Sequence, residues 1–310
     1  MSDVATTRLD RRALGLALTR IANAATSAAA AALEDPPAAH ARRIGITGAP
    51  GAGKSTLAGR LALARLDRGR LGILAIDPSS PKAGGAILGD RIRMDDMAGS
   101  ENLYIRSFGS RSAADGLTDN LHELLETMDR HGFDEVIVET VGVGQAELAA
   151  RTQVDTLILV IPPDAGDVVQ AMKAGIMEIA DIFAINKADM PSAAKMATEV
   201  KRVIALTHRG AAGWVPPVVL TSQSKPDSIA ELSGQVDRHL DWLRSSGGLE
   251  SQNLSRRKYR LRRWLERKAQ AIIDSESAAF FDLPHERQMA MLLRRLAEER
   301  VSGGSDTSSR

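Results

Sequence analysis

The segment Gly48 to Thr56, which reads GAPGAGKST, places the strongest constraint on how this chain folds. It matches the pattern G-x-x-x-x-G-K-[ST], and it stands between an apolar run, Ile44 to Thr47, and a helical pattern, Ser55 to Arg68. Between a strand and a helix, such a loop holds phosphate with its backbone N–H groups and the positive end of the helix. The predicted nucleotide-binding residues of this loop are Gly48, Ala49, Pro50, Gly51, Ala52, Gly53, Lys54, Ser55 and Thr56.

The last three residues of this loop carry the chemistry that the pattern predicts. We expect Lys54 to reach the β- and γ-phosphates and to stabilise charge on the transferring phosphoryl group, which makes it a catalytic residue. We expect the hydroxyl of Ser55 to ligate Mg²⁺ and Thr56 to contact the α-phosphate. A nucleotide and Mg²⁺ are therefore the predicted ligands.

Short apolar runs alternate with helical patterns from Arg43 to Leu243. Seven of the runs are almost continuously apolar, which is typical of parallel strands buried on both faces. The expected strands are Ile44–Thr47, Leu71–Ile76, Leu103–Ile105, Val136–Val138, Thr156–Ile161, Ile182–Ile185 and Val218–Leu220. The predicted fold is an α/β P-loop NTPase with a mostly parallel sheet covered by helices, plus N- and C-terminal helical extensions.

Composition divides the chain into four segments. Residues 1–42 are predicted as an N-terminal helical segment, with a helix from 8 to 34 that Asp35-Pro36-Pro37 terminates. The predicted P-loop domain covers 43–245, and a Ser-Ser-Gly-Gly hinge at its end leads into a C-terminal helical dimerisation arm over 246–302. Residues 303–310 have the composition of a disordered tail.

A second motif predicts which base the nucleotide carries. The buried strand Ile182–Ile185 ends in Asn186-Lys187-Ala188-Asp189, the N-K-x-D arrangement of guanine-binding proteins. A carboxylate at Asp189 can accept two hydrogen bonds, from guanine N1–H and from the exocyclic amine, whereas adenine lacks this pair of donors. Asn186 is expected to brace the loop and the Lys187 stem to lie along the base. The pattern favours guanine, with adenine as the alternative.

The loop after the next strand supplies the other edge of the predicted base site. Val218-Val219-Leu220 is followed by Thr221-Ser222-Gln223-Ser224. We expect backbone N–H groups of Ser222, Gln223 and Ser224 to contact the guanine O6. The alternative is an ordinary turn at the end of a strand.

Three acidic residues are candidates for binding the metal or sensing the γ-phosphate. Asp77 ends the second apolar run, Asp90 follows a Gly-rich segment, and Glu139 ends the run Val136-Ile137-Val138. Mg²⁺ needs only one or two protein carboxylates, because it keeps several waters. We predict Asp77, Asp90 and Glu139 as metal-site residues, with Asp90, Glu139 and Gln145 also catalytic. The alternatives are capping or surface carboxylates and an exposed glutamine.

Composition excludes several other classes of function. The chain has no cysteine, which rules out disulfides and thiolate metal sites and fits a reducing cytoplasm, where we expect the protein. Its formal net charge is +1, so it offers no general attraction for nucleic acid or an anionic membrane. No stretch is long and apolar enough to predict a membrane helix.

Four segments of the chain resemble one known family. They read GAPGAGKST, LAIDPSSPKAGGAILGDRIRM, VIVETVGVGQAE and GIMEIADIFAINKAD, and the similarity runs from about Arg43 to Leu243. The chain is similar to the MeaB/ArgK-type GTPases, which are chaperones of methylmalonyl-CoA mutase and related adenosylcobalamin-dependent mutases.

The resemblance implies a fold related to the signal-recognition and nickel-chaperone GTPases, and a homodimer joined largely through C-terminal helices. It also implies an adenosylcobalamin-dependent acyl-CoA mutase as partner, with adenosylcobalamin present only through that partner. In the family, GTP binding and hydrolysis gate cofactor loading and protect the mutase. By motif, Asp77, Asp90 and Glu139 become metal or switch residues, and 167–181 becomes a mobile segment that signals to the partner.

Two segments, 105–117 and 166–175, depart from the family pattern. The expected client, the mutase that this GTPase would serve, is therefore either methylmalonyl-CoA mutase or another acyl-CoA mutase. A nickel-enzyme metallochaperone is an alternative, although this chain has no cysteine and only six histidines. A small-molecule kinase is another, against which the NKAD motif argues. The basic run Arg256 to Trp264 is interpreted as an amphipathic dimer or docking helix with a solvated basic face rather than an RNA-binding element.

Overall fold

The computed structural model describes residues 8–24, 39–78, 100–110, 120–140, 150–164, 178–207 and 213–298. Within these residues one seven-stranded sheet runs in the order β3-β2-β4-β1-β5-β6-β7, and all of its strand pairs are parallel. The strands are β1 Arg42–Gly48, β2 Leu71–Pro78, β3 Leu103–Ser110, β4 Glu135–Thr140, β5 Thr156–Ile161, β6 Ile182–Ile185 and β7 Val218–Leu220. The predicted α/β fold is confirmed, and each expected strand coincides with an observed one.

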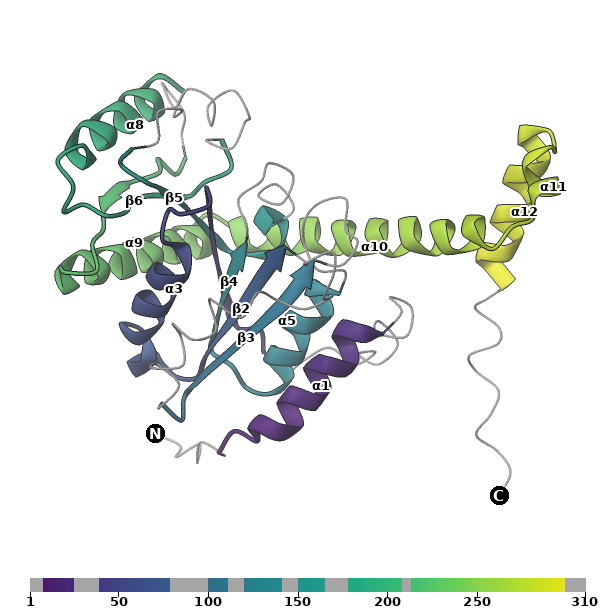
Figure 1. Cartoon of the computed structure of the whole chain (residues 1–310), viewed down its shortest axis with the longest axis horizontal. Coiled ribbons are helices and arrows are strands. Elements are labelled where there is room, and N and C mark those ends of the chain that lie inside the picture. Colours follow the sequence, from purple (N-terminus) through teal and green to yellow (C-terminus); the bar gives the residue numbers. More distant parts are fainter. Residues whose placement is uncertain are drawn as a thin grey trace.

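Helices cover both faces of the sheet (Figure 1). The described helices are α1 Arg11–Asn23, α3 Lys54–Leu63, α5 Leu121–Arg130, α8 Ala193–Thr207, α9 Pro226–Ser245, α10 Gly248–Asp274, α11 Ala278–Phe281 and α12 His285–Glu298, with a short 3₁₀ helix at Leu66–Arg68. Helices α1 and α5 share one hydrophobic cluster with the sheet, and α3 and α9 share another.

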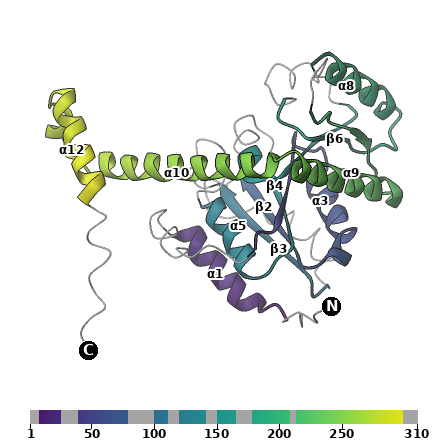
Figure 2. The same ribbon diagram turned by 180° about the vertical axis from the view of Figure 1, so that it is seen from behind.

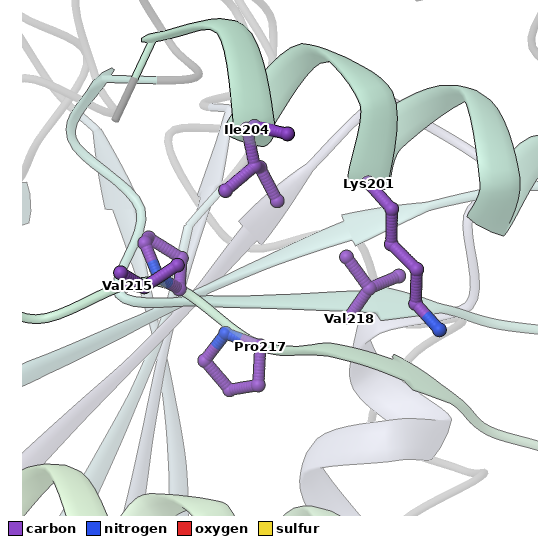
Figure 3. Close-up of a pocket in the computed structure, with 7 residues that line it drawn as sticks. Lys201, Ile204, Val215, Pro217 and Val218 are labelled. Atoms are coloured by element: carbon purple, nitrogen blue, oxygen red, sulfur yellow. The ribbon is translucent and has the colours of Figure 1, made fainter. Parts of the chain in front are cut away.

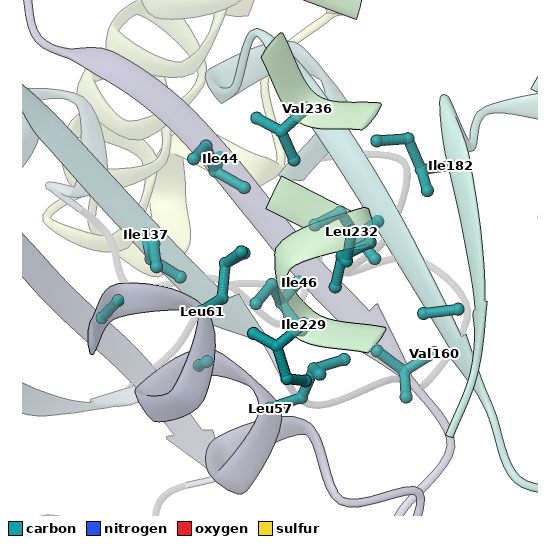
Figure 4. Packing of buried hydrophobic residues seen from close by; sticks show 14 of the residues in the cluster. Ile44, Ile46, Leu57, Leu61, Ile137, Val160, Ile182, Ile229, Leu232 and Val236 are labelled. Carbon is teal, nitrogen blue, oxygen red and sulfur yellow. The ribbon is translucent and has the colours of Figure 1, made fainter. Parts of the chain in front are cut away.

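The cluster under α3 and α9 fixes the loop that follows β1. Figure 4 shows Ile44 and Ile46 of β1 among Leu57 and Leu61 of α3, with Leu232 of α9 nearby. All of these side chains are at most 2% exposed. Truncating one such leucine to alanine costs about 2–5 kcal/mol. This packing fixes the end of β1 relative to the start of α3, so both ends of the loop between them are held in place.

The N-terminal helix is shorter than the sequence predicts. The prediction of one continuous helix from 8 to 34 is wrong, because α1 stops at Asn23 and Ala24 has an extended backbone with ψ of 148°. Residues 25–34 lie outside the described part of the chain. The side chain of Asn120 donates hydrogen bonds to the carbonyl oxygens of Ile21 at 2.7 Å and of Ala24 at 3.0 Å. These bonds satisfy carbonyl groups that a longer helix would have used itself.

Helix α10 begins directly at the predicted hinge. Gly247, with a φ of 74°, separates the end of α9 from α10, which starts at Gly248. The first half of α10 lies against the core, whereas its far end projects away and carries α11 and α12 (Figures 1 and 2). Lys268 near that end donates to the carbonyl oxygen of Leu296 at 3.2 Å, which ties α12 to α10.

The sequence predicts a solvated basic face on α10, but in the structure part of that face is buried. Arg256 is only 8% exposed and forms a close ion pair with Asp155, the residue before β5. Arg260 lies 3.4 Å from Glu123 of α5. Part of the basic run therefore docks the helix onto the core, because buried guanidinium groups need carboxylate partners. No described helix has the length and apolarity needed to span a membrane.

Candidate functional site

The loop from Gly48 to Gly53 follows β1 at the carboxyl edge of the sheet, and its glycines have conformations that other residues rarely adopt. Gly48 has a φ of 143°, and a Cβ there would lie 2.1 Å from the carbonyl oxygen of Val160. Gly53 has a φ of 87°, and a Cβ there would lie 2.5 Å from Nδ2 of Asn186. Glycine is therefore required at both positions by sterics and by backbone conformation.

Helix α3 begins at Lys54 and offers its positive end to the loop. No side chain caps this helix, and its first turn contains no acidic residue. The N–H groups at its start and the helix dipole are thus available to an anion. Lys54 is buried, and its Nζ donates to the carbonyl oxygen of Ala49 at 3.1 Å, across the concave side of the loop.

Ser55 and Glu139 lie together beside the loop. Ser55 Oγ donates to Glu139 Oε1 at 2.6 Å. Glu139 is buried at the end of β4, and the parallel pairing of β1 with β4 brings it to the level of Ile46. Behind this pair, Thr140 Oγ1 donates to Thr47 Oγ1 at 3.0 Å. A hydroxyl and a carboxylate are hard oxygen groups of the kind that Mg²⁺ takes.

The described residues contain no cluster of three or more His, Asp or Glu side chains that could hold a metal. Ser55 and Glu139 together are only two candidate ligands. A Mg²⁺ ion held by these two residues would take its other oxygen ligands from nucleotide phosphate and water, which is its usual manner of binding.

The NKAD segment, residues 186–189, follows β6 and contacts the phosphate loop directly. Asn186 is buried, and its Nδ2 donates to the carbonyl oxygen of Ala52 at 2.8 Å. Thr221, just after β7, donates to Asn186 Oδ1 at 3.2 Å. Lys187 has a φ of 56°, and its Nζ reaches the carbonyl oxygen of Gly51 at 3.0 Å. Asn186 thus joins the loop after β7 to the phosphate loop after β1.

The carboxylate of Asp189 is exposed and held in place from the loop after β7. Ser222 Oγ donates to Asp189 Oδ1 at 2.7 Å, and Ser224 Oγ lies 2.9 Å from Ser222 Oγ. The hydrogen bond from Ser222 is the main cause that lowers the pKa of Asp189, so the group is an ionised acceptor at neutral pH. Gln223 lies beside these residues and is exposed.

The structure brings together the predicted residues of the phosphate loop, Glu139, the NKAD segment and Ser222 to Ser224. The backbone of Asp77 lies in β2 opposite Gly109 of β3, and its side chain is outside what the structure describes. Asp90, Gln145 and most of the segment 167–181 also lie outside the described residues. The brace from Thr221 and the Thr47–Thr140 pair were not predicted from the sequence. Both involve threonines at strand ends, which is the available signal for them.

A separate cavity of about 310 Å³ lies between α8 and β7, away from these loops (Figure 3). Lys201 and Ile204 of α8 face Val215, Pro217 and Val218 across it. Its lining is mostly apolar, with the Lys201 ammonium as the one charged group among the described lining residues. It therefore has little with which to hold a nucleotide phosphate.

Comparison of the sequence with known proteins identifies a matching family and several relatives. A family described as methylmalonyl-CoA mutase-associated GTPase MeaB matches residues 12–279. A Pyrococcus abyssi protein named as a GTPase is 42% identical over 224 residues, which is 71% of this chain and 69% of that protein. The mouse methylmalonic aciduria type A homolog, a mitochondrial protein, is 34% identical over 220 residues, which is 70% of this chain and 53% of that protein.

Among solved structures, the LAO/AO transport system kinase superposes with a TM-score of 0.61 and 23% identity, covering 93% of this chain and 99% of that one. At this identity the likeness shows the fold alone. The family match covers most of the chain, and the Pyrococcus relative is named as a GTPase. The chain therefore belongs to the MeaB family of P-loop GTPases.

Proposed function

We propose that this protein is a GTP-binding and GTP-hydrolysing chaperone that gates cofactor loading into an adenosylcobalamin-dependent acyl-CoA mutase and protects that mutase. The observation that carries the proposal is the family match over residues 12–279, which covers the nucleotide core and most of the C-terminal helices. The family's description names methylmalonyl-CoA mutase, and a relative is named after methylmalonic aciduria. Methylmalonyl-CoA mutase or a related acyl-CoA mutase is the client that we propose.

Each loop has a proposed role in binding and hydrolysing GTP. The phosphate loop holds the β- and γ-phosphates with backbone N–H groups, and Lys54 stabilises the charge that develops as the γ-phosphoryl group leaves. The Asp189 carboxylate accepts the two guanine donors, and Ser222 keeps that carboxylate ionised and oriented. Backbone N–H groups of Ser222 to Ser224 contact the O6 edge of the base.

Ser55 and Glu139 are the described residues that would hold Mg²⁺, with Asp77 and Asp90 as further proposed ligands. Ser55 would contribute its hydroxyl oxygen, which now donates to Glu139 Oε1 at 2.6 Å. When bound, Mg²⁺ would supply positive charge to the phosphate oxygens. Glu139 would then accept from metal-bound water, and Gln145 is proposed to orient the attacking water.

We also propose a homodimer formed by the arm, residues 246–302, and a cytoplasmic location. The arm exposes apolar side chains along α10, α11 and α12, and Leu261 and Leu293 are 64% and 60% exposed. Apolar groups at this exposure on a projecting helical arm support burial against a second copy.

Affinity capture from the native host's extract tests the proposed partner. The bait would be the wild-type chain with a non-hydrolysable GTP analogue, and the control would be Lys54→Ala without nucleotide. We expect a cobalamin-dependent mutase subunit to be enriched by the nucleotide-bound bait. Enrichment of a nickel enzyme, or of no mutase subunit in either nucleotide state, would contradict the proposal and leave only the GTPase.

A further inference from the structure

A cavity of about 370 Å³ lies between the core and the first half of α10, at the end of the sheet opposite the phosphate loop. Arg43 at the beginning of β1 forms one wall, whereas the nucleotide site follows the end of that strand. Helix α5 forms a second wall and α10 forms the third; Figure 2 shows α10 crossing beside α5. The described lining residues are His40, Arg43, His122, Glu126, Asn253, Arg256, Arg257 and Arg260.

The charged groups that line this cavity are mostly cationic. Four guanidinium groups line it against one carboxylate, that of Glu126. Three of these guanidinium groups already have carboxylate partners, and Arg260 lies 3.4 Å from Glu123 and 3.7 Å from Glu126. Asp129 accepts from Arg43 at 2.8 Å and lies 3.0 Å from His40, and Asp155 pairs with Arg256.

Two of the guanidinium groups keep a donor that nothing uses. Arg43 and Arg256 are 3% and 8% exposed. In the part of the chain that the structure describes, Nε of each is buried and has no hydrogen-bond acceptor. A buried donor without an acceptor is unfavourable, so two of them beside one cavity favour an occupant with acceptor oxygens.

His122 lines the cavity close to charges of both signs, and its Nε2 lies 3.8 Å from Glu126 Oε2. Burial lowers the pKa of His122 to about 3, and Arg43 and Arg260 are the next causes. Both guanidinium groups act on the ring as nearby positive charges. An anion bound there would lie among guanidinium groups in a partly desolvated space, where electrostatic attraction is stronger than in water.

We propose that this cavity is a binding site for a phosphoryl group, either free phosphate or the phosphate of a small phosphorylated molecule. Guanidinium groups from β1 and from two turns of α10 approach from different directions, and their planar N–H pairs match phosphate oxygens. The volume is at the lower end of the range for small-molecule sites, about 300–1,000 Å³, and so leaves room for the ester portion of a ligand. Such a ligand contacts the core and α10 at once and holds the arm against the core.

Calorimetric titration of inorganic phosphate into the protein tests this site. The protein is first saturated with Mg²⁺ and a non-hydrolysable GTP analogue, so that the phosphate loop is filled. Sodium chloride at equal ionic strength provides the blank. We expect saturable binding to the wild-type chain. The absence of saturable binding overturns the proposal.

Two substitutions locate the binding. Arg257→Gln and Arg260→Gln are each expected to raise the Kd for phosphate by about tenfold or more, because each removes a charged donor. Lys258→Gln is the matched control, since Lys258 is exposed on the same helix and does not line the cavity. Circular dichroism and GTP turnover confirm that Arg257→Gln remains folded. An unchanged Kd in both arginine variants overturns the site.

Parallel titrations with glycerol 3-phosphate and succinate identify the ligand class. Tighter binding of glycerol 3-phosphate than of phosphate points to an esterified ligand, and equal or weaker binding points to the free ion. Either result supports a phosphoryl site. Succinate binding as tightly as phosphate contradicts the phosphoryl assignment, because a general dianion site would not require tetrahedral oxygens.

Discussion

At the scale of single residues, the nucleotide site depends on short polar side chains that join loops from different strands. Asn186 donates to the backbone of the phosphate loop and accepts from Thr221, and Ser222 holds Asp189. The motifs that contain these residues are visible in the sequence. Their mutual contacts are not, because the loops meet only when the strands before them pair side by side.

We predict that Asp189→Asn exchanges guanine preference for xanthine preference. The amide of asparagine cannot accept both guanine donors, but it can donate to the additional oxygen of xanthine. Losing hydrogen bonds to a charged acceptor should weaken GTP binding by about tenfold to a hundredfold. The measurement is the ratio of Kd values for GTP and XTP, with Asp227→Asn, an exposed carboxylate on α9, as control. An unchanged ratio would refute the assignment of Asp189.

We predict that His122 makes the protein lose stability in mild acid. Burial lowers its pKa in the folded state to about 3 from 6.5, so the unfolded chain binds the proton more readily. The contribution of this pKa difference to the unfolding free energy is fully present above pH 6.5. It declines as the pH falls toward 3, by up to about 1.4 kcal/mol per pH unit.

Urea unfolding from pH 7 to pH 4.5, in buffers without phosphate, measures this effect. His122→Gln should flatten the loss of unfolding free energy over that range, whereas His285→Gln, at an exposed position of α12, should leave it unchanged. Equal slopes for the wild-type chain and His122→Gln would contradict the prediction.

At the scale of helices and strands, the sequence predicts the sheet better than the helix ends. The strands are buried on both faces, so each appears as an uninterrupted apolar run such as Thr156–Ile161. The end of α1 depends instead on Asn120, a residue far along the chain. The docking of the first half of α10 also depends on distant residues, because Arg256 and Arg260 attach it to the core through ion pairs with Asp155 and Glu123. Local sequence patterns do not reveal contacts between residues that are far apart in the chain.

We predict that Asn120→Ala destabilises the packing of α1 on α5. Two carbonyl groups at the end of α1, those of Ile21 and Ala24, lose their donor in a largely buried place. The unfolding free energy should fall by about 1–3 kcal/mol. Chemical denaturation measures it, and Thr198→Ala, which removes an exposed local hydrogen bond on α8, serves as control. A loss no larger than that of the control would show that Asn120 does not determine where α1 ends.

At the scale of the whole molecule, a compact nucleotide core carries a long helix whose far end extends into solvent (Figure 1). The fold of the core can be predicted from two sequence motifs and from the alternation of apolar runs with helical patterns. The cavity under α10 could not be predicted, because it arises where β1, α5 and α10 meet in space. Its lining arginines look like a solvated basic run until the ion pairs to Asp155 and Glu123 are seen.

We predict that the arm makes the protein a dimer. Light scattering coupled to size exclusion should give twice the mass of one chain, and the double substitution Leu261→Asp with Leu265→Asp should give the single mass, because charges cannot be buried unpaired at the interface. Leu206→Asp, at an exposed apolar position of α8 that is 55% exposed, should stay dimeric. A monomeric wild-type chain would contradict the proposed dimer.

Steady-state GTP turnover shows whether this GTPase serves a mutase, as we propose. The rate is measured with the wild-type chain and with Lys54→Ala, alone and with each purified adenosylcobalamin-dependent acyl-CoA mutase of the native host. We predict that one mutase accelerates turnover by the wild-type chain, and that Lys54→Ala lowers turnover by about a hundredfold to a thousandfold. Turnover that no mutase changes, or that survives Lys54→Ala intact, would contradict the account.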